Sequence, residues 1–260
     1  MKKNTKKQLI NLIYPLISIA VVVVCWLILA SVVKNELVVP TIGDTISEMG
    51  KIFMQKQFYL SLLRTLLRTL IAVAVSFILA GATASLSFVF KKVGRVVSPL
   101  ISVVRTIPTM AVLLMILLWS NPNVAPIIVA ILVLFPMIYA QFITAMNGID
   151  QGVINTAKVF NLTKKDKLFK VYVPMIMPNL ISNLGSNISF GIKLIVSAEV
   201  MAYTFNSLGG MMQTASVYLN LPRLAGLTIV AVVLGLIIEG TFAILVKKLF
   251  KWTRTEVDYD

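Results

Sequence analysis

Six long apolar runs, separated by shorter polar connections, constrain the fold of this 260-residue chain more than any other feature. A helix needs roughly 20 apolar residues to cross the hydrocarbon core of a bilayer. Inside lipid, the backbone donors and acceptors of a crossing segment must be satisfied within that segment, which favours helices. The sequence therefore predicts an all-α membrane protein, one transmembrane domain over residues 1–260, with spans at about 12–33, 66–90, 97–119, 125–146, 180–203 and 224–246.

Charged residues are scarce in this chain, and most of them are basic. Asp, Glu, Lys and Arg make up 13% of the residues, about half the share that is usual in soluble domains. In a soluble protein, the net charge of +14 would indicate nucleic-acid binding. Here the lysines lie between apolar runs, so we interpret them as flanks of spans beside the lipid bilayer and expect no nucleic-acid partner.

The distribution of the basic residues predicts the orientation of the spans. About 16 of the 24 basic residues lie in the two terminal tails, in the turn at 91–95 and in the connection 147–179, and the positive-inside rule places these segments in the cytoplasm. Both termini are therefore expected to be cytoplasmic. The basic N-terminus resembles the start of a signal peptide, but the apolar run at 12–33 is too long and lacks a small-residue cleavage site, which indicates a retained first span.

The chain offers little to hold a metal or to catalyse a reaction. It contains one cysteine, Cys25, and no histidine, whereas a zinc site usually has four ligands drawn largely from these two residue types. A phosphate-binding Gly-x4-Gly-Lys-Ser/Thr motif is absent, so we expect no hydrolysis of ATP by the chain itself. No nucleophile lies beside a base in the sequence, which disfavours a membrane enzyme. We expect this chain to bind no cofactor and no metal.

Two of the connections predicted to face outward carry structural signals. Thr41 or Asp44 is suited to cap a short amphipathic helix that runs to about Phe53 along the membrane surface. The connection 205–222 is long and contains a Gly-Gly pair. Its length and its glycines fit a re-entrant or half-buried segment at the outer mouth.

The cytoplasmic connection 147–179 is expected to fold as two short helices at an angle. The first covers about 152–160 and ends at Asn161, a residue type that accepts left-handed backbone geometry. Thr163 and Asp166 have the spacing of a capping box that would start the second helix. Pro174 and Pro178 are then expected to break the path before the fifth span. Docking to another protein and an ordinary amphipathic connector both remain open.

Three stretches of the chain resemble one known family. The run Asn155-Thr156-Ala157-x3-Asn161-x9-Val171-Tyr172-Val173-Pro174 has the register of the "EAA" loop, E-A-A-x3-G-x9-I-x-L-P, of ABC importer permeases. Residues 105–111, Arg-Thr-Ile-Pro-Thr-Met-Ala, are similar to the family's R-x-I-P-x-x-A run. The Ala-Glu-Val-Met of 198–201, followed by Leu-Gly-Gly at 208–210, is similar to its A-E-M and G-L-G run. The likeness covers about 60–250 and is greatest to the nitrate, sulfonate, taurine and bicarbonate branch.

This resemblance implies a function, a fold and a set of partners. The chain would be a six-helix type I permease subunit in the bacterial inner membrane, and would translocate a small solute, such as one of those anions, by alternating access. Its implied partners are a second copy of itself, an external solute-binding protein and two ABC ATPase subunits, which use the ATP. An ion-gradient-driven secondary carrier is the alternative, although six spans without a detectable inverted repeat disfavour it.

In the family, the loop forms a coupling helix that fits a cleft of the ATPase subunit. Here Asn155 replaces the usual Glu and removes a charge, Thr156 replaces the first Ala, and Asn161 replaces the Gly. Ala157 keeps the second Ala, and we expect the partner's cleft to exclude a bulky side chain at this position. Val171, Val173 and Pro174 complete the register.

Polar residues of the fifth predicted span share one helical face, because they recur at steps of three or four. They are Ser182, Ser186, Ser189, Lys193 and Ser197, with Asn179, Asn183 and Asn187 on the adjoining strip. Polar side chains are costly in lipid, so this face should meet protein or water. It is either a wall of the translocation pathway or a surface where serines permit close packing of helices.

Lys193 lies roughly 20 Å from the inner end of its span, by the rise of a helix, too deep to reach the cytoplasm easily. It needs water, an anionic substrate or a buried partner, for which Glu199 and Glu239 are the candidates. For Glu199 itself we expect hydrogen bonds that lock helices together, not proton transfer. Arg105 is expected to snorkel or to pair with Glu239.

Arg64 and Arg68 lie one helical turn apart where the second predicted span begins. Both are expected to anchor that helix at the lipid headgroups.

Overall fold

The computed structural model describes residues 2–35 and 37–249, and within these it is entirely helical, as the sequence predicts. The helices are α1 Lys2–Val33, α2 Ile42–Phe53, α3 Lys56–Val89, α4 Lys91–Thr106, α5 Thr109–Leu117, α6 Ala125–Asn147, α7 Gln151–Val159, α8 Lys164–Asp166, the π-helical turn η1 Lys167–Tyr172, α9 Val173–Met201, α10 Leu208–Val217 and α11 Leu221–Leu249.

The core forms where α3, α6 and α9 pack against one another, with α11 along α9. Small residues bring the helices close together, as is usual in membrane bundles. A Cβ on Gly191 of α9 would lie 3.1 Å from Thr69 of α3, and one on Gly81 of α3 would lie 3.1 Å from the ring of Phe142 in α6. Close packing of the helices therefore depends on glycines that leave room for neighbouring side chains, as well as on large apolar groups.

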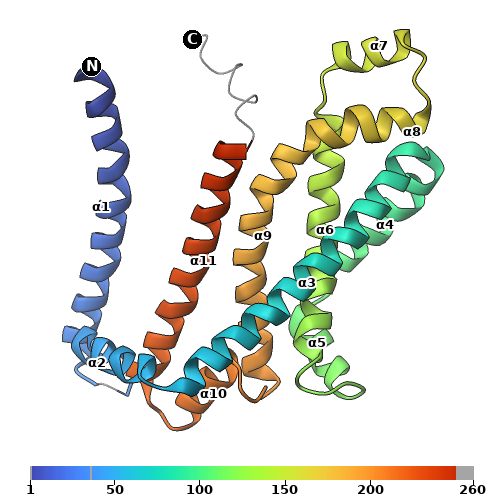
Figure 1. Ribbon diagram of the computed structural model, residues 1–260. Coiled ribbons are helices and arrows are strands. Elements are labelled where there is room, and N and C mark those ends of the chain that lie inside the picture. Colours follow the sequence, from blue (N-terminus) through green and yellow to red (C-terminus); the bar gives the residue numbers. More distant parts are fainter. Residues whose placement is uncertain (1, 36, 250–260) are drawn as a thin grey trace.

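Short elements cover the two ends of the bundle (Figure 1). At one end, which we call the α7 end, lie α7, α8 and the turn between α3 and α4. At the other, the α10 end, lie α2, α10 and the connection from α5 to α6. The helix α2 begins where the sequence predicts, since Thr41 caps it by accepting a hydrogen bond from the backbone N–H of Asp44 at 3.1 Å.

The long helices agree with the predicted spans in part. The helices α3, α6, the η1–α9 unit and α11 are each long and apolar enough to cross a membrane, and α4 with α5 qualifies as a bent pair. The helix α6 agrees with the span predicted at 125–146, whereas α3 begins at Lys56, well before the predicted 66. The apolar part of α1, Ile17–Val33, is the remaining candidate.

The third predicted span, 97–119, is wrong as a single helix. It is broken at Pro108 into α4 and α5, whose axes differ by 91°. Ile107 and Pro108 are both extended, with ψ of 127° and 114°. A proline disfavours helical geometry in the residue before it, and it lacks the N–H that the helix would need.

The expected break at Pro174 and Pro178 is also wrong. A continuous helical path runs from Lys167 to Met201, and Figure 1 shows it bending from α8 and η1 into α9. Pro174 sits in the first turn of α9, where a missing N–H costs little. Pro178 lies inside the helix, so the chain bends but does not stop.

The helix α1 stands apart from the bundle in Figure 1. Trp26 connects it to the start of α2, because its indole N–H donates to the carbonyl oxygen of Pro40 at 2.9 Å. Most of its described apolar side chains, including Val22 and Val32, are exposed. An isolated apolar helix of this kind must meet lipid or another protein chain.

Candidate translocation pathway and coupling loop

The turn after α7 has the geometry that the sequence predicts for Asn161. This residue adopts φ of +50°, and the N–H of Leu162 donates to the carbonyl of Ala157 at 3.3 Å. A left-handed residue followed by this 6→1 hydrogen bond is the Schellman ending of a helix. Asn161 therefore adopts the left-handed conformation that a glycine would adopt at this position.

The second short helix starts at the expected cap. Thr163 accepts a hydrogen bond from the N–H of Asp166 at 3.1 Å and donates its hydroxyl to the Asp166 carboxylate at 2.6 Å. Asp166 also pairs with Lys170 at 2.7 Å. The hydrogen bond from Lys170, and then the one from Thr163, hold the pKa of Asp166 below its usual value. The loop is thus fixed by local bonds on both sides of its turn.

The predicted coupling residues do not all face outward. Asn155, Thr156, Asn161 and Pro174 are exposed, and Val171 and Val173 are half-buried. Ala157 is only 7% exposed. The expectation that a partner's cleft excludes a bulky side chain at Ala157 stays a prediction.

The surface that α7 presents includes two apolar residues that the sequence analysis missed. Val159 is 79% exposed and Phe160 is 73% exposed, at the tip of the α7 end. Their exposure could not be predicted from residue type, because apolar residues at the end of a short amphipathic helix are normally assigned to its buried face. Their exposure makes this tip a surface suited to burial by another protein.

On α9, part of the predicted polar face is occupied by helix packing. Ser186 donates to Glu239 of α11 at 2.9 Å, and Asn187 exchanges two hydrogen bonds of 2.9 Å with Gln141 of α6. Ser189 is buried. These residues support the close-packing interpretation, because each polar group is satisfied by a neighbouring helix or sealed from lipid.

Lys193 and Ser197 lie farther along that face, and both are exposed. They line a groove of about 400 Å³ between α9, α10 and α11, which also includes Met110 of α5. Among the described residues, no carboxylate forms a salt bridge with Lys193. Of the alternatives expected for Lys193, the buried pair with Glu199 or Glu239 is therefore wrong.

Glu199 forms the most heavily bonded buried site of the described chain. It is fully buried and accepts hydrogen bonds from Arg68 at 2.8 Å, from Thr65 at 2.8 Å and from the N–H of Gly209 at 3.1 Å. The expectation of helix-locking hydrogen bonds at Glu199 is confirmed. Arg68 is not a headgroup anchor, because it is buried in an ion pair with Glu199.

The same cluster attaches the α5–α6 connection and α10 to the bundle. Arg68 donates from Nη2 to the side chain of Asn123 at 3.0 Å, and Thr65 accepts from the N–H of Leu208 at 2.9 Å. The 205–222 connection is accordingly half-buried, as predicted. Gly209 is required at this point, since a Cβ there would lie 2.4 Å from the Cβ of Glu199.

Arg105, at the end of α4, does not pair with Glu239, the one partner predicted for it. Its Nη2 donates to the carbonyl oxygen of Pro136 in α6 at 2.8 Å. Glu239 accepts from Ser186 instead, so the expected Arg105–Glu239 pair is wrong. The Arg105 bond connects the broken α4–α5 unit to α6 and gives this side chain a structural task.

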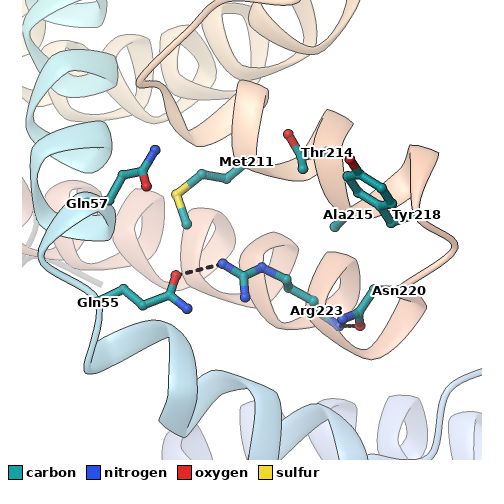
Figure 2. Close-up of a pocket in the computed structure, with 8 residues that line it drawn as sticks. All are labelled: Gln55, Gln57, Met211, Thr214, Ala215, Tyr218, Asn220 and Arg223. Carbon is teal, nitrogen blue, oxygen red and sulfur yellow. Dashed lines mark hydrogen bonds between the residues drawn. The ribbon is translucent and has the colours of Figure 1, made fainter.

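A polar hollow of about 390 Å³ opens at the α10 end, between α10, the start of α11 and the link from α2 to α3. Figure 2 shows Arg223 extending to Gln55, to which it donates from Nη2 at 2.7 Å. The hollow is completed by Gln57, Met211, Thr214, Ala215, Tyr218 and Asn220. Its described lining contains one positive charge and no carboxylate.

Comparisons with known proteins agree with the geometry. Residues 72–251 match the family described as binding-protein-dependent transport system inner membrane component. The Bacillus subtilis protein SsuC, named for aliphatic sulfonates transport, is 28% identical over 244 residues, 90% of this chain and 85% of SsuC. The taurine transport system permease protein TauC of Escherichia coli is 25% identical over 159 residues, 60% of this chain and 57% of TauC.

Solved structures show a similar fold. A chain of an amino acid ABC transporter, crystallised with histidines, is similar over 78% of this chain and 96% of its own length. The TM-score is 0.62 and the sequence identity is 19%. At this identity the likeness concerns the arrangement of helices alone.

Proposed function

The chain belongs to the family of binding-protein-dependent transport system inner membrane components, and we propose that within this family it forms the pathway for a small anion as one half of a homodimer. It is a multi-pass permease subunit of an ABC importer in the inner membrane. The family works with separate ATPase subunits and with solute-binding proteins. The secondary carrier is therefore set aside, and the chain is a transport subunit, not an enzyme.

The observation that carries the anion proposal is the position of Lys193. Its ammonium lies in a groove with largely apolar walls, where an isolated charge costs about 3 kcal/mol or more in lipid. If Lys193 had a purely structural role, a carboxylate would be expected beside it. The candidate on α9, Glu199, is instead paired with Arg68. Nitrate, sulfonate, taurine or bicarbonate would supply negative charge during passage, and the names of SsuC and TauC agree with sulfonate chemistry.

A second copy of this chain would complete the groove. The most apolar window of α11 is only 6% buried, and most side chains of α1 between Ile17 and Val33 are exposed. Both helices are far more open than the core helices α3, α6 and α9. A homodimer in which the partner covers α11 and the groove would enclose Lys193 from both sides.

Coupling to the ATPase subunits is proposed for the loop from Asn155 to Pro174, with Val159 and Phe160 as its contact surface. The helical path from α8 through η1 into α9 carries no break, so a displacement of α7 can reach the wall that holds Lys193. Glu199 then connects that wall to α10 through the N–H of Gly209. ATP-driven closure of the ATPases would thereby change access at both ends. The chain itself would bind no cofactor.

The external solute-binding protein is proposed to dock at the α10 end. The hollow of Figure 2 faces this end and offers amide and hydroxyl groups around Arg223. Interfaces of moderate size are often anchored by arginine and tyrosine, and both types are present here, as Arg223 and Tyr218. Docking would press on α10, which the buried Glu199 site connects to α3 and α9.

Substitution of Lys193 tests the proposed function directly. In proteoliposomes that hold the complete importer, Lys193→Met should lower substrate uptake roughly 10- to 100-fold, since a hydrogen bond to a charged group is worth about 1.5–3 kcal/mol. Lys193→Arg keeps the charge and should retain most of the uptake. Normal uptake by Lys193→Met would contradict the proposal, as would equal losses in both variants with an intact complex.

A further inference from the structure

Two adjacent hollows lie at the α7 end, between the last turns of α3 and the η1 turn. They share Val89 and Leu168, and their volumes are about 160 and 310 Å³. Phe88 and Tyr172 line the smaller one, and Phe90 and Phe169 line the larger one. We refer to them as the α3–η1 hollows. Their walls are mainly apolar, although they lie where the chain leaves the membrane.

Each of these hollows has one lysine in its lining. Lys165 lines the larger and Lys167 lines the smaller. The carboxylate between them in sequence, Asp166, pairs with Lys170, and among the described residues no other carboxylate forms a salt bridge here. Lys91 and Lys92 begin α4 directly after Phe90. The α3–η1 hollows therefore combine an apolar wall with an excess of positive charge.

The apolar wall continues along the lipid-facing surface of the bundle. Phe90 and Leu86 are each about half exposed, and Phe169 is 60% exposed. Farther along α3, Ile78 and Leu79 are exposed in the same way, on a helix apolar enough to cross the membrane. An acyl chain that lies beside α3 would therefore reach the α3–η1 hollows without crossing a polar surface.

We propose that the α3–η1 hollows bind an anionic phospholipid. Its phosphate would lie between Lys165 and Lys167, and an acyl chain would follow Phe90 and Phe169 along α3. Basic pockets at the ends of membrane helices attract anionic headgroups, and the long lysine side chains can place their charges at headgroup level while their stems cover the apolar wall. An anionic phospholipid supplies both the negative charge and the apolar chain.

The position of the hollows argues against the ATPase subunit as the occupant. Figure 1 shows α7 on one side of the α8–η1 segment and the end of α3 on the other. The exposed tip at Val159 and Phe160 belongs to the α7 side. A partner that docks on α7 therefore leaves the α3–η1 hollows open toward the membrane.

Native mass spectrometry of the purified chain tests the proposal. Detergent micelles would contain equal amounts of phosphatidylglycerol and phosphatidylcholine, and the lipids retained on the protein would be counted. The wild type should retain phosphatidylglycerol preferentially, and Lys165→Gln/Lys167→Gln should bind it about tenfold more weakly. The matched control is Lys247→Gln/Lys248→Gln, which removes two lysines of α11 from the same end and should keep the preference.

Three results would overturn the proposal. An equal loss in the control variant would show a general attraction of lipid to positive charge. Displacement of the lipid by soluble glycerol phosphate at equal concentration would identify a free-phosphate site without an acyl chain. Release of the lipid on addition of the ATPase subunits would assign the hollows to the subunit interface. Lipid retained by the control variant, in the presence of glycerol phosphate and after addition of the ATPase subunits would support the proposal. The elution volume of the Lys165→Gln/Lys167→Gln variant verifies that it is correctly folded.

Discussion

At the scale of single residues, the buried pair of Arg68 and Glu199 shows how charge is used inside this bundle. The two side chains lie 2.8 Å apart, with Glu199 fully buried and Arg68 largely so. A buried ion pair contributes little net stability, but the loss of one partner leaves an uncompensated charge. The pair therefore specifies how α3, α9 and α10 fit together.

Removal of one member of this pair should be worse than removal of both. Glu199→Ala should destabilise the chain by about 3–5 kcal/mol, because it strands the Arg68 guanidinium, and Glu199→Met with Arg68→Met should recover much of that loss. Thermal unfolding in detergent measures the difference. Arg64→Ala is the matched control, since Arg64 is exposed one turn away on α3 and should change little. A double variant no more stable than Glu199→Ala would contradict this account.

At the scale of elements, α10 depends on one close approach to α9. A Cβ on Gly209 would lie 2.4 Å from the Cβ of Glu199 and 2.6 Å from the carbonyl oxygen of Val196. We expect Gly209→Ala to displace α10, to lower the unfolding temperature and to weaken stimulation of the ATPases by the loaded binding protein. Gly240→Ala in α11 is the control, because its added methyl would have no neighbour within 4 Å. Equal behaviour of the two variants would disprove the close fit.

In the second short element, α7, two substitutions distinguish loss of ATPase binding from loss of stability. Val159→Asp changes an exposed side chain and should release the ATPase subunits while the unfolding temperature stays the same. Ala157→Trp overpacks a buried position, which typically costs about 1–3 kcal/mol, so it should lower stability as well as ATPase binding. Co-purification of the subunits, together with thermal unfolding, distinguishes the two. If the Val159→Asp variant retained the ATPase subunits, α7 would not form the coupling surface.

At the scale of the whole molecule, the α7 end should be cytoplasmic and the α10 end external. In a Cys25→Ser background, an impermeant thiol reagent added to intact cells should label Met54→Cys, which is exposed beside α2, and spare Lys165→Cys. Met54 suits this purpose because its side chain takes part in no described hydrogen bond. Labelling of Lys165→Cys in intact cells would reverse the orientation. The same preparations, analysed by native mass, should contain two copies of the 28.6 kDa chain.

The sequence by itself determined the properties that depend on local spacing and on composition. Apolar run length predicted the membrane helices, the basic residues predicted which connections lie together, and Thr41 and Asn161 predicted a helix start and a helix end from their own backbone preferences. The register of the 155–174 loop predicted the family. Each of these signals can be read along the chain, so no knowledge of the packed bundle is needed.

The tertiary structure alone decided which polar residues have partners. Arg68 and Glu199 meet across 131 positions, and Arg105 finds the Pro136 carbonyl on another helix, so neither contact has a signal in local periodicity. Likewise, helical spacing places Ser186 and Lys193 on one face, but only the position of α11 shows that Ser186 is bonded and Lys193 is open. Which charges are compensated depends on contacts between distant segments, and those contacts exist only once the helices are packed.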